Sequence, residues 1–186
     1  MRKDLGLKNY LYPQPVLILQ TYDKDGNVDA MNAAWGGISD AYEITISLSK
    51  YHKTVSNLKE SKAMCISPAT LNTLVESDYF GVVSANDVKN KIENVHFHVV
   101  KSKHVNAPII LEYPLTLECE LLNYDDEREL ATLKIINTSV DDSILTNNKI
   151  DIKKLQPISF DACNNKYVLL SDNVGNAFKD GLKLKK

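Results

Sequence analysis

Val16-Leu17-Ile18-Leu19-Gln20-Thr21-Tyr22 is the stretch from which the fold class of this chain can be read. It begins as an unbroken apolar run and is entered through Pro13 and Pro15, which is typical of a buried β-strand. Asp25-Gly26 then supplies two residues that tolerate the positive φ of a tight turn. The chain can return as a second strand over residues 28–34, so this segment predicts a β-hairpin.

The same period of two continues along the chain and predicts six further strands. They are expected at residues 44–49, 63–67, 115–121, 130–140, 158–160 and 167–170. Helical patterns are fewer, at 54–60, in one or two segments within 71–83 that Tyr79-Phe80-Gly81 would interrupt, and at 151–155. Many strands with short connections predict a mainly β fold, an antiparallel barrel with peripheral helices. We expect one domain over residues 1–186, with an irregular loop at 86–106.

The composition of the chain argues against several classes of function. The net charge of −2 gives no reason to expect nucleic acid or an anionic membrane as a partner. No apolar run approaches the roughly 20 residues needed to span a bilayer, and the charged N-terminus lacks the apolar core of a signal peptide. Cys65, Cys119 and Cys163 are widely spaced and form no CxxC pair. A cytoplasmic location is therefore expected.

A possible anion site lies in Ser47-Leu48-Ser49-Lys50-Tyr51-His52-Lys53-Thr54. A predicted strand ends in hydroxyl residues, passes through potentially cationic side chains, and enters a helix at Thr54. A helix N-terminus presents unpaired N–H groups and a partial positive charge, so Lys50, His52, Lys53 and Thr54 fit a phosphate. The same pattern also fits a solvated basic loop that ends in an ordinary N-cap threonine.

Two further segments carry weaker signals. Met31-Asn32-Ala33-Ala34-Trp35-Gly36-Gly37 sets the single tryptophan beside small residues, which let a backbone approach a flat ring. A core tryptophan followed by a turn gives the same pattern. Val88-Lys89-Asn90-Lys91 places a basic pair in the irregular loop, and such lysines reach a phosphate or are simply solvated.

Other catalytic templates are missing from the sequence. The four histidines have no carboxylate or cysteine at a metal-ligand spacing, so no metal site is expected. The chain has neither the GxSxG of a hydrolase elbow nor the GxGxxG of a dinucleotide fold. We therefore expect no acid–base or nucleophilic catalytic set of the protein's own.

Taken in order, these stretches resemble the flavoredoxin branch of the flavin reductase-like family. The resemblance covers nearly the whole chain, and its specificity comes from the order and spacing of many short motifs. The matching segments are Pro13-Gln14-Pro15-Val16, Met31 to Gly37, Ser47-Leu48 with His52-Lys53-Thr54, Asp78 to Ser84, Asn106-Ala107-Pro108, Pro114 to Cys119, and Asn165-Lys166-Tyr167.

The resemblance implies a Greek-key split β-barrel, usually a homodimer, that binds FMN without a covalent link. It places Asn32, Ala33, Ala34 and Trp35 along the flavin, and Ser47, Leu48 and Ser49 at the edge of its ring. It assigns the phosphate to Lys50, His52, Lys53 and Thr54, with Ser84 close by. The family often has Asp-Lys-Phe after a Ser-Gly turn, and we match its lysine to Lys91. Here Ala85 replaces the glycine and Ile92 the aromatic residue.

The activity implied is electron transfer through FMN, because the cofactor carries the redox chemistry and the protein orients it. The donor would be NADH, NADPH or a protein, and the acceptor is open. One alternative is a flavin reductase that oxidises a nicotinamide and releases reduced flavin. Others are an FMN-binding module without turnover and a purely structural barrel.

Overall fold

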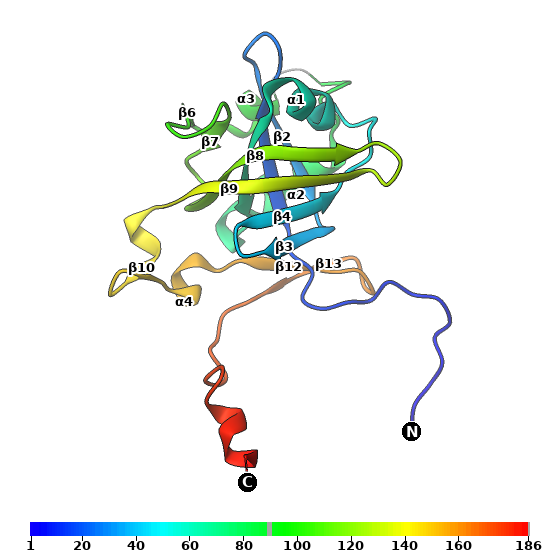
Figure 1. Cartoon of the computed structure of the whole chain (residues 1–186), viewed down its shortest axis with the longest axis vertical. Coiled ribbons are helices and arrows are strands. Elements are labelled where there is room, and N and C mark those ends of the chain that lie inside the picture. The colour runs from blue at the N-terminus through cyan, green and yellow to red at the C-terminus, as the bar shows by residue number, and fades with distance from the viewer. Residues whose placement is uncertain (89–90, 186) are drawn as a thin grey trace.

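The computed structural model describes residues 1–88 and 91–185 and is built around one seven-stranded antiparallel sheet. The strands follow the spatial order β2-β1-β5-β8-β9-β4-β3 (Figure 1). Their bounds are β1 (Leu17–Tyr22), β2 (Val28–Ala33), β3 (Gly36–Asp40), β4 (Glu43–Ser47), β5 (Ala63–Pro68), β8 (Leu115–Asp125) and β9 (Leu130–Val140).

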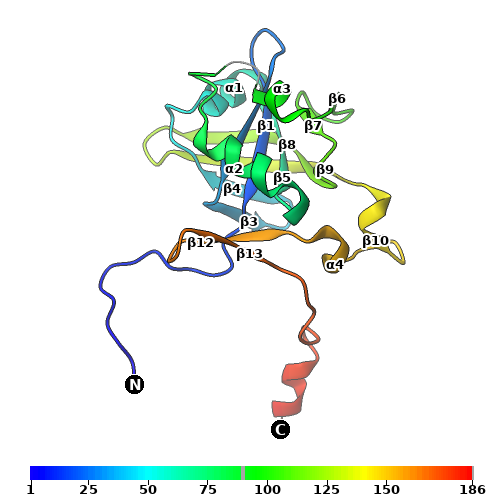
Figure 2. The same cartoon turned by 180° about the vertical axis from the view of Figure 1, so that it is seen from behind.

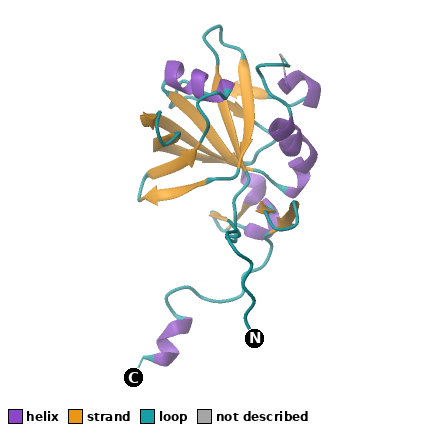
Figure 3. Ribbon diagram, turned by 90° about the vertical axis from the view of Figure 1, so that its right-hand side faces the viewer, coloured by secondary structure: helices purple, strands orange, loops and turns teal. Residues whose placement is uncertain are grey.

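The sheet curls into a split barrel because its two edge strands are consecutive in sequence. β2 ends at Ala33 and β3 begins at Gly36, so Ala34 and Trp35 alone join the opposite edges. Three Cα–Cα steps span at most about 11 Å, which brings these two edges together at that end. The Ser47 amide donates to the Trp35 carbonyl at 2.8 Å and fixes the link against the end of β4. Figure 3 shows the strands curving around a common interior.

Short helices and hairpins cover the barrel. α1 (Lys53–Ser61) packs against β1, whereas α2 (Leu74–Val82) and α3 (Lys91–Val95) pack on β2 (Figure 2). The remaining elements are β6 (Val99–Lys101), β7 (Pro108–Ile110), β10 (Leu145–Thr146), β11 (Lys149–Ile150), α4 (Ile152–Leu155), β12 (Ile158–Asp161), β13 (Lys166–Leu169) and the 3-10 turns η1 (Leu71–Thr73), η2 (Asp142–Ile144) and η3 (Asp180–Leu184).

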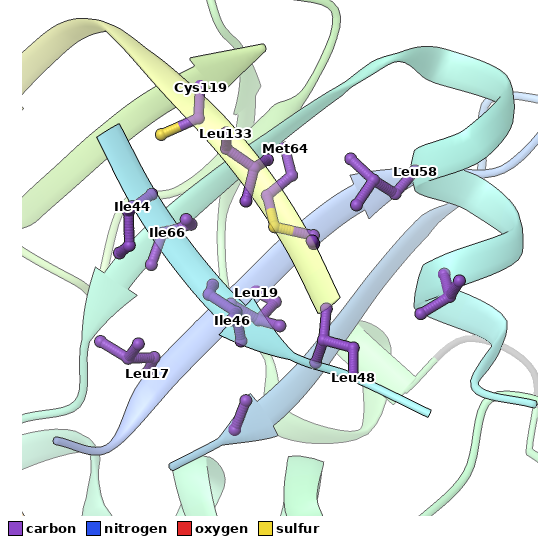
Figure 4. Close-up of a cluster of buried hydrophobic side chains, with 13 residues drawn as sticks. Leu17, Leu19, Ile44, Ile46, Leu48, Leu58, Met64, Ile66, Cys119 and Leu133 are labelled. Carbon is purple, nitrogen blue, oxygen red and sulfur yellow. The ribbon is translucent and has the colours of Figure 1, made fainter. Parts of the chain in front are cut away.

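β1 is buried on both faces, which explains its unbroken apolar start. Leu17 and Leu19 point into the barrel, where they meet β4, β5, β9 and α1 (Figure 4). Val16 and Ile18 face the other way, into a second core formed with α2, α3, β7 and β12. The strand therefore joins the barrel to the layer that covers it.

The predicted hairpin, the mainly β barrel and its peripheral helices are confirmed. Three local expectations are wrong. Gly36-Gly37 opens strand β3 instead of a turn, and α2 runs on to Val82 through Tyr79-Phe80-Gly81. The irregular loop at 86–106 contains α3 and β6. Lys89 and Asn90, part of the predicted basic segment, lie outside the described residues.

Both chain ends extend away from the barrel on the same side (Figures 1 and 2). The N-terminal arm, residues 1–12, and the C-terminal arm, residues 172–185, are exposed throughout. Among the described residues, no helix is long and apolar enough to cross a membrane.

Leu19→Ala tests the barrel core, because Leu19 is fully buried in the centre of its apolar cluster. We expect this substitution to lower the free energy of unfolding by about 2–5 kcal/mol, the usual cost of removing a buried leucine side chain. Denaturant titration measures the change. Val75→Ala is the control, because Val75 lies on α2 with 73% of its surface exposed. It should change stability by less than about 0.5 kcal/mol. Similar losses in both variants would contradict this account of the core.

Candidate functional site

A groove follows the edge strand β2 and consists of three adjoining cavities. The central cavity, of about 140 Å³, lies between β2, the start of α1 and the end of α2. The outer cavity, of about 310 Å³, shares Asp29, Lys53, Ala85 and Lys91 with it. The inner cavity, of about 280 Å³, shares Asn32 and Gly81 and extends to Ala34 and Tyr167. The three cavities adjoin at these shared residues, and together they are called the groove below.

The N-terminus of α1 opens into the central cavity. Its N-cap is His52, whose side chain makes no capping hydrogen bond, and the first turn carries no acidic residue. The Val55 and Ser56 amides both donate to the His52 carbonyl, at 3.1 and 3.3 Å. The Lys53 and Thr54 amides have no acceptor among the described residues. Unpaired N–H groups at a helix N-terminus form a binding site for an anion.

Thr54 is not the N-cap that the sequence predicts but the second residue of α1. Its hydroxyl donates to Asp29 Oδ2 at 2.7 Å, and both residues are buried. Because a hydroxyl has one proton, Thr54 donates to this carboxylate and its side chain has no second proton for another acceptor. The anion-binding groups it offers are therefore those of the backbone.

Lys91, the first residue of α3, brings a buried positive charge to the same place. Its ammonium donates to the Val83 carbonyl at 2.9 Å and lies 3.5 Å from Asp29 Oδ1. Burial lowers the pKa of Lys91, and the Asp29 carboxylate opposes that shift by favouring the charged form. An ammonium has three donors, so Lys91 retains capacity for a further acceptor.

Of the three cavities, the inner one is lined by the fewest charged residues, and its lining is more apolar. Gly81 packs so tightly on β2 that an added Cβ would lie 3.2 Å from Asn32 Cβ. The Asn32 amide donates to the Ser77 carbonyl at 2.9 Å, which fixes the side chain against α2. Tyr167 donates to Asp78 at 2.6 Å across the cavity mouth. Desolvation by burial and this carboxylate raise the pKa of Tyr167 to about 12, so it remains a hydrogen-bond donor.

The loop after α2 closes the groove on the solvent side. Ser84 lines the central cavity, and its hydroxyl accepts from the Asn86 amide at 3.1 Å. The Asn86 side chain donates to the Tyr51 carbonyl at 3.3 Å. This hydrogen bond links the loop to the segment that leads into α1.

The groove brings together seven of the thirteen residues predicted for the site. These are Asn32, Ala34, His52, Lys53, Thr54, Ser84 and Lys91. Ala33 points into the barrel core instead. Trp35 is 60% exposed and lines a separate depression against the N-terminal arm.

The segment Ser47 to Lys50 does not line the groove in the described chain. The Leu48 side chain is part of the barrel core, its amide donates to the Glu129 carbonyl, and its carbonyl accepts from the Tyr124 hydroxyl. The Ser49 hydroxyl and the Lys50 amide both donate to the Glu129 carboxylate, at 3.1 and 3.0 Å. These groups are therefore engaged within the protein.

Sequence reasoning missed Asp29, Gly81, Asp78 and Tyr167 as groove residues. Asp29 alternates with Val28 and Ala30 in the return strand of the predicted hairpin, a pattern that fits an exposed residue. The structure buries it instead. A buried carboxylate needs a partner, which indicates a lysine or hydroxyl nearby. Nothing local in the sequence brings Tyr167 to α2, since their contact depends on the chain path through β12.

The structure is thus a curled antiparallel barrel with cavities along its edge strand β2, at the N-terminus of α1. The family model of the flavin reductase like domain matches residues 9–155 of this chain. The chain therefore belongs to the flavin reductase-like family.

Solved structures agree with this assignment. The chain is similar to flavoredoxin of Desulfovibrio vulgaris (Miyazaki F), with 29% identity, a TM-score of 0.93, and coverage of 97% of this chain and 100% of that one. It is similar to flavoredoxin from Methanosarcina acetivorans, with 25% identity, a TM-score of 0.88, and coverage of 98% and 100%. An FMN-binding domain of a flavin reductases-like enzyme from Shewanella baltica OS155 shares the fold at 17% identity and a TM-score of 0.79, covering 88% and 89%.

Thr54→Val tests the buried contact between α1 and β2. Valine keeps the shape of threonine but leaves both Asp29 oxygens without a hydrogen bond, so unfolding free energy should fall by about 1–3 kcal/mol. Thr54→Ser is the matched control, because it keeps the hydroxyl and loses one methyl group. Denaturant unfolding of the ligand-free protein compares the two variants. Equal stability of the valine and serine variants would refute the inferred role of the hydroxyl.

Proposed function

We propose that this chain is an FMN-binding oxidoreductase of flavoredoxin type that transfers electrons through its bound cofactor. The main observation in support of this function is the uncapped N-terminus of α1, which faces a cavity lined by Lys53 and Lys91. Family membership and the similarity to two flavoredoxins support a flavin as the ligand. We propose NADH, NADPH or a protein as the electron donor.

The residues of the central cavity fit a phosphate. The Lys53 and Thr54 amides would donate to its oxygens, the Lys53 and Lys91 ammonium groups would offset its charge, and the Ser84 hydroxyl keeps its proton for donation. His52 lines the same cavity and would add a donor when protonated. Asp29 opposes this set, because its carboxylate repels an anion.

The inner cavity fits a flat, partly polar ring. Ala34 and Gly81 contribute small walls, while Asn32 and Tyr167 contribute polar groups. Bound FMN accepts a hydride or single electrons and passes them on, so the protein's part is to orient the ring and exclude water. The contacts of Ala33, Trp35 and the segment Ser47 to Lys50 with the ring stay predictions.

Two redox roles fit this site, and their kinetics differ. A carrier retains FMN and reduces a protein acceptor, whereas a flavin reductase oxidises a nicotinamide and releases reduced flavin. We favour the carrier, because two similar proteins, at 29% and 25% identity, are flavoredoxins. The free thiols of Cys65, Cys119 and Cys163 support a reducing, cytoplasmic setting.

The proposal predicts that the purified protein shows the visible absorbance of a flavin, or gains it on addition of FMN, and is bleached by a suitable donor. Oxidation of NADH and NADPH, followed with and without added free flavin, separates the reductase from the carrier. A protein that neither contains nor binds FMN would overturn the proposal.

The substitution Lys53→Gln tests whether the phosphate of FMN binds beside Lys53. Loss of one cation should weaken FMN binding by roughly two- to tenfold, which corresponds to about 0.4–1.4 kcal/mol, and leave riboflavin binding unchanged because riboflavin has no phosphate. Lys59→Gln is the control on the last turn of the same helix, where Lys59 pairs with Asp126. Flavin fluorescence titration gives the affinities of the unsubstituted protein and of both variants for FMN and for riboflavin. Equal losses for FMN and riboflavin would place the phosphate elsewhere.

We also propose a homodimer. The two arms carry exposed apolar side chains with no place in the barrel core, among them Leu5, Leu7, Val174 and Phe178. A second copy would bury such side chains at low cost. Light scattering coupled to gel filtration should give the mass of two 20.9 kDa chains, and a monomer mass at micromolar concentration would contradict this.

A further inference from the structure

Asp29 is a negative charge in a place where the proposed ligand needs positive ones. It lies on β2, is 5% exposed, and lines both the central and the outer cavity. Asp23 and Asp25 also line the outer cavity, so the groove beyond the phosphate end carries three carboxylates against Lys53 and Lys91. A site built only to hold an anion would not bury a carboxylate among its cations.

Asp29 contacts two groups at the phosphate end of the groove, the Thr54 hydroxyl and the Lys91 ammonium. Oδ2 takes the Thr54 hydroxyl proton at 2.7 Å, and Oδ1 lies 3.5 Å from the Lys91 ammonium. Oδ1 is buried and receives no hydrogen bond from any described residue. The carboxylate therefore depends on the Lys91 charge, and in the ligand-free protein Lys91 depends on the carboxylate.

The charges of Asp29 and Lys91 together determine how strongly this part of the groove attracts a phosphate. Opposite charges at similar distances from a third charge cancel to a large extent, because each Coulomb energy varies inversely with distance. The buried pair thus gives a phosphate little net attraction, although Lys91 alone would give much. Removing either partner would also leave the other charge buried without compensation.

We propose that Asp29 is an internal counterion that holds Lys91 and Thr54 in the ligand-free protein and limits the affinity of the groove for the phosphate of a flavin mononucleotide. This inference rests on the proposed function. It makes Asp29 a specificity-determining residue: with the Lys91 charge offset, the phosphate is held mainly by Lys53 and the α1 amides. FMN is then favoured over riboflavin less strongly than both lysines together would dictate.

Asp29→Asn tests the inference, since the amide keeps the size of the side chain and an acceptor for the Thr54 hydroxyl but removes the charge. We expect FMN affinity to rise at least fivefold, with riboflavin affinity unchanged within about twofold. The FMN affinity of the variant should also fall more steeply with salt, because more net charge is paired on binding. Lower FMN affinity, or equal gains for FMN and riboflavin, would overturn the inference.

Ligand-free stability provides a readout that is independent of affinity. Asp29→Asn removes the counterion of Lys91, so the melting temperature without ligand should fall and the rise on FMN addition should exceed that of the unsubstituted protein. An unchanged ligand-free melting temperature together with a smaller FMN-induced rise would also contradict the proposal.

Together with Asp29→Asn, the variant Lys91→Met and the double variant Asp29→Asn/Lys91→Met complete a double-mutant cycle. Lys91→Met should weaken FMN binding at least fivefold, because it leaves the carboxylate repulsion alone. The double variant, which lacks both charges, should bind FMN within about threefold of the unsubstituted protein. If Asp29→Asn alone does not fold, the double variant must still bind FMN at least fivefold more tightly than Lys91→Met. Failure of the unsubstituted protein to bind FMN would refute the proposed function itself.

Discussion

The two-residue link between β2 and β3 is the constraint on which the rest of the structure depends. Because Ala34 and Trp35 join the opposite edges of the sheet, the sheet must curl, and its interior becomes an apolar core lined by β1, β4, β5 and β9. The same constraint leaves β2 with one unpaired edge. α1, α2 and α3 pack against that strand, and the space between them is the groove. The edge strand that results from barrel closure is thus also one wall of the groove.

The site combines general features of the fold with charges particular to this chain. A helix N-terminus beside a sheet edge attracts an anion whatever the side chains are. Lys53 and Lys91 strengthen that attraction, whereas Asp29 offsets it from within the groove. Under the proposed function, affinity for a ligand phosphate would be set by a balance between backbone and side chains, and a single charge would shift it without altering the barrel.

Much of the fold could be predicted from sequence because β1 begins with an unbroken apolar run before a turn signal, and β8 and β9 carry regular apolar periods. β3 could not, since Gly36-Gly37 resembles a turn; in fact a Cβ at Gly36 would lie 2.9 Å from the Thr45 carbonyl, so close strand packing requires glycine there. The basic segment before α1 pointed to His52 and Lys53, which line the central cavity in the structure. The partner of Thr54 stayed hidden, because Asp29 is 25 residues away and meets it only once α1 lies across β2.

The hydrogen bond from the Asn86 side chain to the Tyr51 carbonyl has a kinetic consequence. It joins the loop after α2 to the entry of α1 over the groove, is 3.3 Å long, and is exposed to solvent. A neutral hydrogen bond contributes about 1 kcal/mol net, far less than the free energy that holds a domain folded. Breaking it would release one of the contacts that hold this loop to α1, while all seven strands could stay paired. Entry and release of a ligand would then be governed by loop motion rather than by the much slower unfolding of the barrel.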